Sequence, residues 1–254
     1  MPFKEHGFYL NKQVFWDTIK TRYDIPLSRL PEKCVCGKDF DVNHAFTCKT
    51  GGFIGIRHNE IRDFTAELLK EVCKDVEVEP VLTPLTGEQF KYKSAKTDDN
   101  ARPDISARGI WIRGSKAFFD VRVFNPLAST YHKMTLPAAH RDNENQKKRE
   151  YGERIQQVEH GSFTPLVFCS FGGMSVECSK FYKHVSEKIS EKRDIPYSVA
   201  TSWIRTKLSF SLVKTANLCI RGSKSLKPRV NELSDTAIRM AVADTRLDTE
   251  KRGE

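Results

Sequence analysis

Hydrophobic residues recur at helical spacing in several stretches of the chain. In residues 53–75 they fall on one stripe, which predicts an amphipathic helix; the stripe consists of Ile61, Phe64, Leu68, Leu69 and Val72. Residues 1–30 show a weaker helical spacing, and residues 143–160 form a strongly polar helical stretch. Two further helices are predicted at residues 175–194 and 198–224, before a charged tail that starts at residue 229.

Other segments have the composition of β-strands. Residues 76–82 predict one strand, and residues 163–171 predict a buried strand because they are apolar and end at two glycines. Residues 104–112, which include IWI, and residues 117–124 flank the turn sequence RGSK and predict a hairpin. A helix directly before the buried strand is typical of a crossover unit. The order of elements predicts an α/β fold with a mixed central β-sheet flanked by helices.

Composition and charge narrow the class of protein. The 254 residues, of which 39% are hydrophobic, can fill the core of one large domain with a small appendage. The formal net charge of +9 suits a polyanion such as nucleic acid better than a small neutral substrate, although other basic proteins share it. No segment approaches the roughly 18 apolar residues of a membrane span, so we expect an intracellular protein without a membrane partner.

The seven cysteines are unevenly placed, with three of them in residues 34–48. This arrangement indicates metal binding and buried thiols in a reducing compartment rather than a disulfide framework. Cys34, Cys36, His44 and Cys48 offer three thiolates and one imidazole, a closed tetrahedral set for Zn²⁺. The alternative is a group of buried cysteines near an unrelated histidine, since only one residue separates the first pair.

Two acidic residues interrupt the largely apolar hairpin. Side chains alternate along a strand, so Asp120 and Arg122 share one face. If RGSK turns the chain back, Asp104 lies beside Asp120, and two carboxylates that close repel each other unless a cation lies between them. This predicts a Mg²⁺ site that faces a phosphodiester. The alternative leaves Asp104 as a turn or cap residue and pairs Asp120 with Arg122 or another cation.

The sequence ARPDI followed by AFFDVRV resembles the PD-(D/E)XK nuclease pattern. In that pattern a Pro-Asp and a second acid on the next strand bind the metal, and a lysine two positions later assists catalysis. The resemblance assigns the metal to Asp104 and Asp120 and places Arg122 at the position of the lysine. Because arginine stays protonated, Arg122 can hold a phosphate but cannot readily act as a base.

The segment NQKKREYGERI is similar to the helix that carries the displaced lysine in the restriction-like endonuclease domains of non-LTR retrotransposons. The resemblance assigns catalysis to Lys147 or the adjacent Lys148, supported by Tyr151, which lies on the same helix face as Lys147. The alternative is that these lysines have no catalytic role and lie on a solvated basic surface of the helix. The order of a Cys-Cys-His-Cys knuckle, a helix, an acidic hairpin and a Lys-Tyr helix over about residues 25–170 also resembles that family.

The sequence RHN, at the start of the helix after the knuckle, resembles the same domain. Arg57, His58 and Asn59 are donors suited to phosphate contact at a helix N-terminus. Many PD-(D/E)XK nucleases add an acid from the first helix to the metal site, for which Glu60 is the preferred candidate and Glu67 the second. Without that role, Glu60 would favour the helix dipole and Glu67 would be a surface residue.

The resemblance implies a restriction-endonuclease-like core with a small N-terminal zinc knuckle. The expected domains are residues 1–50 with the helical lead and knuckle, residues 51–228 with the nuclease and C-terminal helices, and the tail of residues 229–254. The implied activity is Mg²⁺- or Mn²⁺-dependent nicking of DNA in the nucleus by part of a retrotransposon polyprotein without its reverse transcriptase. Element RNA is a second implied partner. The alternatives are a nucleic-acid-binding zinc protein with an inactive nuclease site and an intracellular scaffold that binds a protein.

Overall fold

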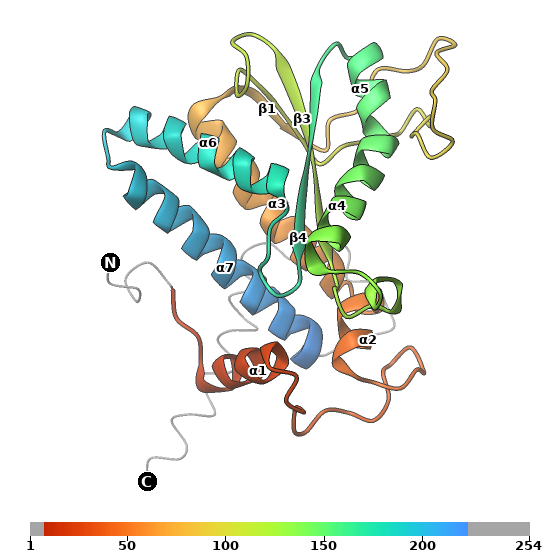
Figure 1. The fold of residues 1–254 in the computed structure, drawn as a ribbon, viewed down its shortest axis with the longest axis vertical. Helices are drawn as coiled ribbons and strands as arrows, with labels where there is room; N and C mark the ends of the chain where they lie inside the picture. The colour runs from red at the N-terminus through yellow and green to blue at the C-terminus, as the bar shows by residue number, and fades with distance from the viewer. Residues whose placement is uncertain (1–7, 223–254) are drawn as a thin grey trace. The chain divides into compact units, whose positions relative to one another are not determined.

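The computed structural model describes residues 8–222 of the chain (Figure 1). The chain divides into two compact units, one formed by Met1–Arg57 with Phe210–Glu254 and the other by His58–Ser209. The charged tail expected from residue 229 lies outside the described residues. None of the helices in the described part has both the length and the apolar character that crossing a membrane requires.

The unit His58–Ser209 is built around a mixed sheet of four strands in the order β1-β2-β3-β4. The strands are β1 (Lys74–Val78), β2 (Ile105–Arg108), β3 (Lys116–Phe124) and β4 (Ser162–Cys169). β2 is antiparallel to both β1 and β3, whereas β3 and β4 are parallel and are joined through helices, as in a crossover unit. The predicted α/β class with a mixed sheet is therefore confirmed.

The hairpin of β2 and β3 has a shorter first strand than the pattern predicts. β2 ends at Arg108, and the IWI sequence lies in the connection between the strands. Gly109 has a φ of +94°, a left-handed conformation that interrupts the extended backbone and that residues with a side chain rarely adopt. The apolar run therefore continues past the end of the strand.

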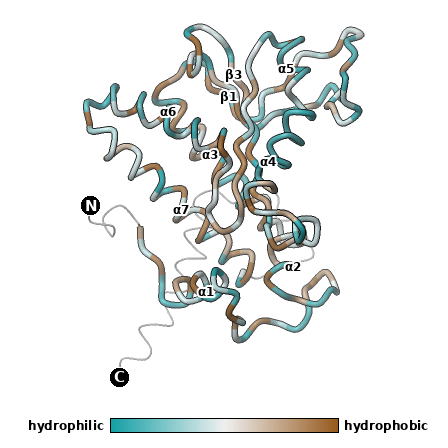
Figure 2. The backbone as a smooth tube through the Cα atoms, viewed as in Figure 1, coloured by the Kyte–Doolittle hydropathy of each residue, from teal (hydrophilic) through white to brown (hydrophobic). Residues whose placement is uncertain are grey.

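Helices cover both faces of this sheet (Figure 1). On one face lie α3 (Phe53–Val72) and α6 (Val176–Arg193), where Phe119 of β3 packs against Phe181 with 4.8 Å between ring centroids. On the other face lie α4 (Leu136–Lys147), the π-helical turn η2 (Lys148–Gly152) and α5 (Glu153–Gln157), with core clusters around Phe118 and Phe124. Figure 2 shows hydrophobic positions along the strands and mainly hydrophilic ones along α4 and α5.

α4 begins at Leu136, well before residue 143, where the sequence pattern places the helix. The Thr135 side chain caps the helix by accepting a hydrogen bond from the Ala138 amide. Its buried positions are mainly polar and include His140, Asn143 and Glu144. A helix with polar side chains on its inward face has no hydrophobic period by which to recognise its start.

The other unit contains α1 (Lys12–Arg22), α2 (Val42–Thr47) and the end of α7 (Tyr197–Arg221). Asp17 of α1 is buried, and the Arg221 guanidinium donates to both of its carboxylate oxygens over 2.7 and 3.0 Å. Burial alone would raise the pKa of Asp17, but hydrogen bonds from Arg221 and Gln13 lower it below its ordinary value. This ion pair joins the first described helix to the last one.

Candidate functional site

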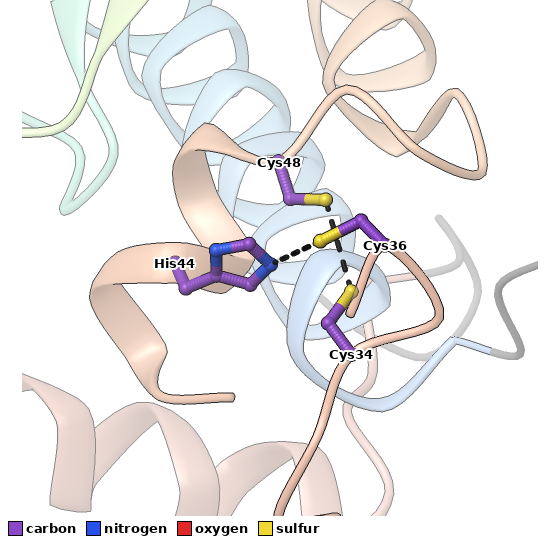
Figure 3. A group of neighbouring side chains, drawn as sticks. All are labelled: Cys34, Cys36, His44 and Cys48. Carbon is purple, nitrogen blue, oxygen red and sulfur yellow. Dashed lines mark hydrogen bonds between the residues drawn. The ribbon is translucent and has the colours of Figure 1, made fainter. Parts of the chain in front are cut away.

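Four potential metal ligands gather in the unit that contains α2. Cys34 and Cys36 lie on a tight turn in which Gly37, at a φ of +86°, donates its amide hydrogen to the Cys34 carbonyl over 2.8 Å. His44 lies in α2, and Cys48 is the residue at which this helix ends. The turn and the helix direct the four side chains toward one another (Figure 3).

The distances within this cluster suit a tetrahedral zinc ion. The Sγ atoms of Cys34 and Cys48 are 3.8 Å apart, Cys36 Sγ is 3.3 Å from His44 Nε2, and all four ligand atoms lie within 4.8 Å of one another. Zinc–sulfur bonds of about 2.3 Å place two sulfurs of a tetrahedron about 3.8 Å apart. The cluster can therefore hold zinc, as the sequence predicts. Within residues 8–222, no other group of three or more cysteine, histidine or acidic side chains is gathered in this way.

Asp104 and Asp120 meet at the open end of the β2–β3 hairpin. Ile105 pairs with Phe119, so the next residues outward, Asp104 and Asp120, stand opposite each other. Asp104 Oδ2 accepts a 2.6 Å hydrogen bond from the Val121 amide. Both acids are buried, with 9% and 4% of their surface exposed. The hairpin register thus brings together the two acids that the sequence pattern singles out.

Each of the two carboxylates has a basic side chain beside it. His58 of α3 places Nε2 2.9 Å from Asp104 Oδ1. Lys147, the last residue of α4, places Nζ 2.9 Å from Asp120 Oδ2 and 3.1 Å from the Glu150 carboxylate. The end of the hairpin, α3 and the end of α4 therefore form one cluster of opposite charges.

Burial and charge perturb the protonation of this cluster. Burial, followed by the negative charge of Asp104, raises the pKa of Asp120 to about 6, although Lys147 opposes the shift. Burial would lower the pKa of His58, but its hydrogen bond to Asp104 and the charges of both acids raise it overall. Burial also opposes the charge of Lys147, whereas Asp120 and Glu150 raise its pKa. A divalent cation would relieve the repulsion that disfavours the charged form of Asp120.

The helical segment that carries Lys147 changes its geometry at the site. Lys148–Gly152 form a π-helical turn, a feature that is frequent at functional sites. Lys147 Nζ lies 5.7 Å from the centre of the Tyr151 ring, and the Tyr151 hydroxyl donates to the Arg102 carbonyl over 3.0 Å. Lys148 instead forms an ion pair with Glu177 of α6. The structure therefore brings Lys147, and not Lys148, to Asp120.

The two arginines of the predicted site have opposite environments. Arg122 lies on the same face of β3 as Asp120, is half-buried and forms no ion pair within the described residues. Arg57 is only 2% exposed, and its guanidinium donates to the Phe46 carbonyl over 3.3 Å. The guanidinium of Arg57 therefore lies in the protein interior, and its predicted contact with nucleic acid stays a prediction.

His58 is the residue of α3 that the structure places against Asp104. Residues two apart on a helix face different directions, so Glu60 does not share the side of α3 that His58 occupies. Glu60 and Asn59 are half-buried, and Glu67 is exposed. A metal-binding role for Glu60 or Glu67 and a phosphate contact by Asn59 stay predictions.

Two members of the charged cluster, His58 and Glu150, are not predicted there by the sequence. The sequence pattern places His58 at a phosphate and indicates no role for Glu150. Lys147 and Glu150 are three residues apart on a helical segment, and this spacing was a signal for their ion pair. His58 and Asp104 are 46 residues apart, and no local pattern predicts their contact.

No model of a protein family and no curated protein matches this chain. Its function has therefore to be inferred from the geometry and chemistry of its own residues.

The zinc cluster predicts the metal content of the purified protein. Elemental analysis after dialysis against metal-free buffer should find one zinc ion per chain. Cys48→Ser should lose this zinc, whereas Cys73→Ser, at a half-buried cysteine outside the cluster, should retain it. Zinc removal should also destabilise the fold around α2, because binding to such a site is coupled to folding. Full zinc retention by Cys48→Ser would contradict the assignment.

Without added Mg²⁺ or Mn²⁺ and with zinc retained, Asp120→Asn should make the protein more stable at pH 8. A folded-state pKa of about 6, above the ordinary 3.8, means that the charged carboxylate destabilises the fold. The penalty is absent below pH 3.8 and complete above pH 6, so the variant should gain up to about 3 kcal/mol at pH 8 and lose this gain toward pH 4. Urea unfolding across this range measures the difference. A variant less stable than the native protein at pH 8 would contradict this prediction, because the ion pair of Asp120 with Lys147 would then contribute more stability than the burial of the carboxylate removes.

Proposed function

We propose that the chain is a metal-dependent endonuclease that nicks DNA. The observation that carries the proposal is the pair of buried acids, Asp104 and Asp120, which stand opposite each other with Lys147 beside them. Two acids and a lysine in this arrangement are suited to metal-assisted hydrolysis of a phosphodiester. The net charge of +9 supports a polyanionic substrate.

The order of elements in the unit His58–Ser209 supports a restriction-endonuclease-like core. A helix precedes three antiparallel strands, and a helical crossover leads to a parallel fourth strand. The zinc cluster precedes this core along the chain, as does the knuckle in the restriction-like endonuclease domains of non-LTR retrotransposons. We therefore infer that the chain derives from such an element and acts on nuclear DNA.

Each residue of the site has a separate role in the proposed reaction. Asp104 and Asp120 would hold Mg²⁺ or Mn²⁺, which polarises a phosphate and lowers the pKa of bound water. Lys147, held between Asp120 and Glu150, would neutralise the negative charge that develops on the phosphate. Arg122, on the same face of β3 as Asp120, can bind a neighbouring phosphate through two parallel hydrogen bonds.

A second candidate function is nucleic-acid binding without cleavage. It is favoured by the arginine at position 122, where the nuclease pattern has a lysine, and by the basic side chain that already lies beside each carboxylate. Such a protein would need no Mg²⁺, and its affinity for DNA would fall steeply with added salt, because phosphate contacts release counterions. Metal-independent binding that is not followed by cleavage would favour this function.

The nicking of supercoiled plasmid with Mg²⁺ or Mn²⁺ tests the nuclease. Asp104→Asn and Asp120→Asn keep the shape of each side chain and remove its charge, so either substitution should abolish nicking. Lys147→Met should slow nicking by about 100-fold or more, because it removes a positive charge beside the reacting phosphate. Lys148→Met is the matched control and should retain activity, because Lys148 pairs with Glu177.

Circular dichroism and urea unfolding establish first that each variant is folded. The nuclease proposal is rejected if the folded native protein leaves the plasmid intact with both metals. It is also rejected if Asp104→Asn and Asp120→Asn nick as fast as the native protein.

A further inference from the structure

The long connection between β1 and β2 leaves and re-enters the sheet at nearly the same place. The Glu79 amide donates to the Asp104 carbonyl over 2.8 Å, and the Leu82 amide donates to the Ala101 carbonyl over 3.3 Å. Leu82 and Ala101 are buried in the core cluster around Phe118. Between them, residues 83–100 form a loop without helix or strand. Long loops whose ends lie close together are often functional.

A fully buried arginine holds this loop against the rest of the unit. Arg154 of α5 has no exposed surface, and its guanidinium donates to the carbonyls of Thr83, Lys96 and Asp98 over distances of 2.8 to 3.0 Å. Burying a guanidinium is costly unless its hydrogen bonds are satisfied. Arg154 therefore depends on the loop for acceptors, and the loop depends on Arg154 for its path.

The same helical segment also binds amides of the loop. Glu153 accepts a hydrogen bond from the Lys91 amide over 2.8 Å, and the Glu150 carbonyl accepts one from the Lys96 amide over 2.8 Å. The Glu150 side chain pairs with Lys147. The loop is thus attached directly beside the lysine of the proposed nuclease site.

Positive charge is concentrated in the middle of the loop. Residues 91–96, KYKSAK, contain three lysines and no acid; Glu88, Asp98 and Asp99 flank them. The three lysines are exposed and form no ion pair within residues 8–222. Tyr92 is 38% exposed, and Lys91 Nζ lies 5.5 Å from the centre of its ring. This segment therefore exposes three lysine side chains without an ion pair in the described part of the chain. The hydrogen bonds of Arg154 hold the backbone of the loop that carries them.

We propose that residues 91–96 form a docking surface for the phosphate backbone of duplex DNA. The inference rests on the proposed function and specifies which part of the chain holds the DNA that flanks the cut. Lysines that contact phosphates orient a duplex without reading its sequence. Because Arg154 holds the loop before DNA binds, association loses little free energy through ordering of the loop.

DNA binding without divalent metal tests the docking surface separately from cleavage. The probe is a 30-base-pair duplex of arbitrary sequence, and the loop variant of the full chain carries Lys91→Gln, Lys93→Gln and Lys96→Gln. The matched control carries Lys70→Gln, Lys74→Gln and Lys183→Gln, which remove the same charge at exposed positions.

The loop variant should bind about 100-fold more weakly than the control at about 0.1 M salt. Its slope of log affinity against log salt should be smaller by about 2 to 3, since each lost phosphate contact removes about 0.9. Equal affinities and slopes for the two variants would overturn the docking surface, and so would failure of the native protein to bind the duplex. Loop-dependent binding by a protein that does not nick plasmid would support the docking surface and reject the nuclease.

Discussion

The ion pair between Asp120 and Lys147 connects the sheet to the helices that cover one of its faces. Asp120 lies on an inner strand with 4% of its surface exposed, where an isolated carboxylate would be costly. Lys147 supplies the opposite charge from the end of α4, and Glu150 shares it. The π-helical turn that follows places Tyr151 in the core cluster around Phe118. This buried charge therefore constrains how the sheet, α4 and the π-helical turn fit together.

The two acids differ in the hydrogen bonds that they accept. Asp104 accepts hydrogen bonds from the Val121 amide and from His58, and these bonds would justify an aspartate there on structural grounds. Asp120 accepts no comparable bond from the backbone within the described residues, and the charge of Asp104 adds to its cost of burial. Buried ion pairs can often be replaced by apolar residues without loss of stability. The proposed metal site would account for an acid at position 120 despite this cost of burial.

The local sequence was sufficient to predict that the two acids lie together and that the four potential zinc ligands lie together. Alternation along β3 places Asp120 and Arg122 on one face, and the hairpin register then sets Asp104 opposite Asp120. The four zinc ligands lie in one short segment, where a turn and one helix suffice to gather them. In both places the contacts follow from the backbone geometry of one short segment of the chain.

Packing between distant segments decided what the sequence could not predict. The choice between Lys147 and Lys148 depends on how α4 is rotated against the sheet, and its polar inward face leaves no hydrophobic pattern that would reveal this rotation. The burial of Arg57 and the contact of His58 with Asp104 likewise depend on where α3 packs. The loop of residues 83–100 could be recognised as a loop, but its attachment to Arg154 could not.

Whether Asp104 and Asp120 bind a divalent metal is tested most directly by anomalous diffraction from crystals of the native protein grown with Mn²⁺. We expect a manganese peak bound by a carboxylate oxygen of each aspartate, with Lys147 moved away from Asp120. The zinc peak at Cys34, Cys36, His44 and Cys48 serves as the internal control for metal detection. A zinc peak without manganese at the two acids, in crystals that contain saturating Mn²⁺, would contradict the metal site.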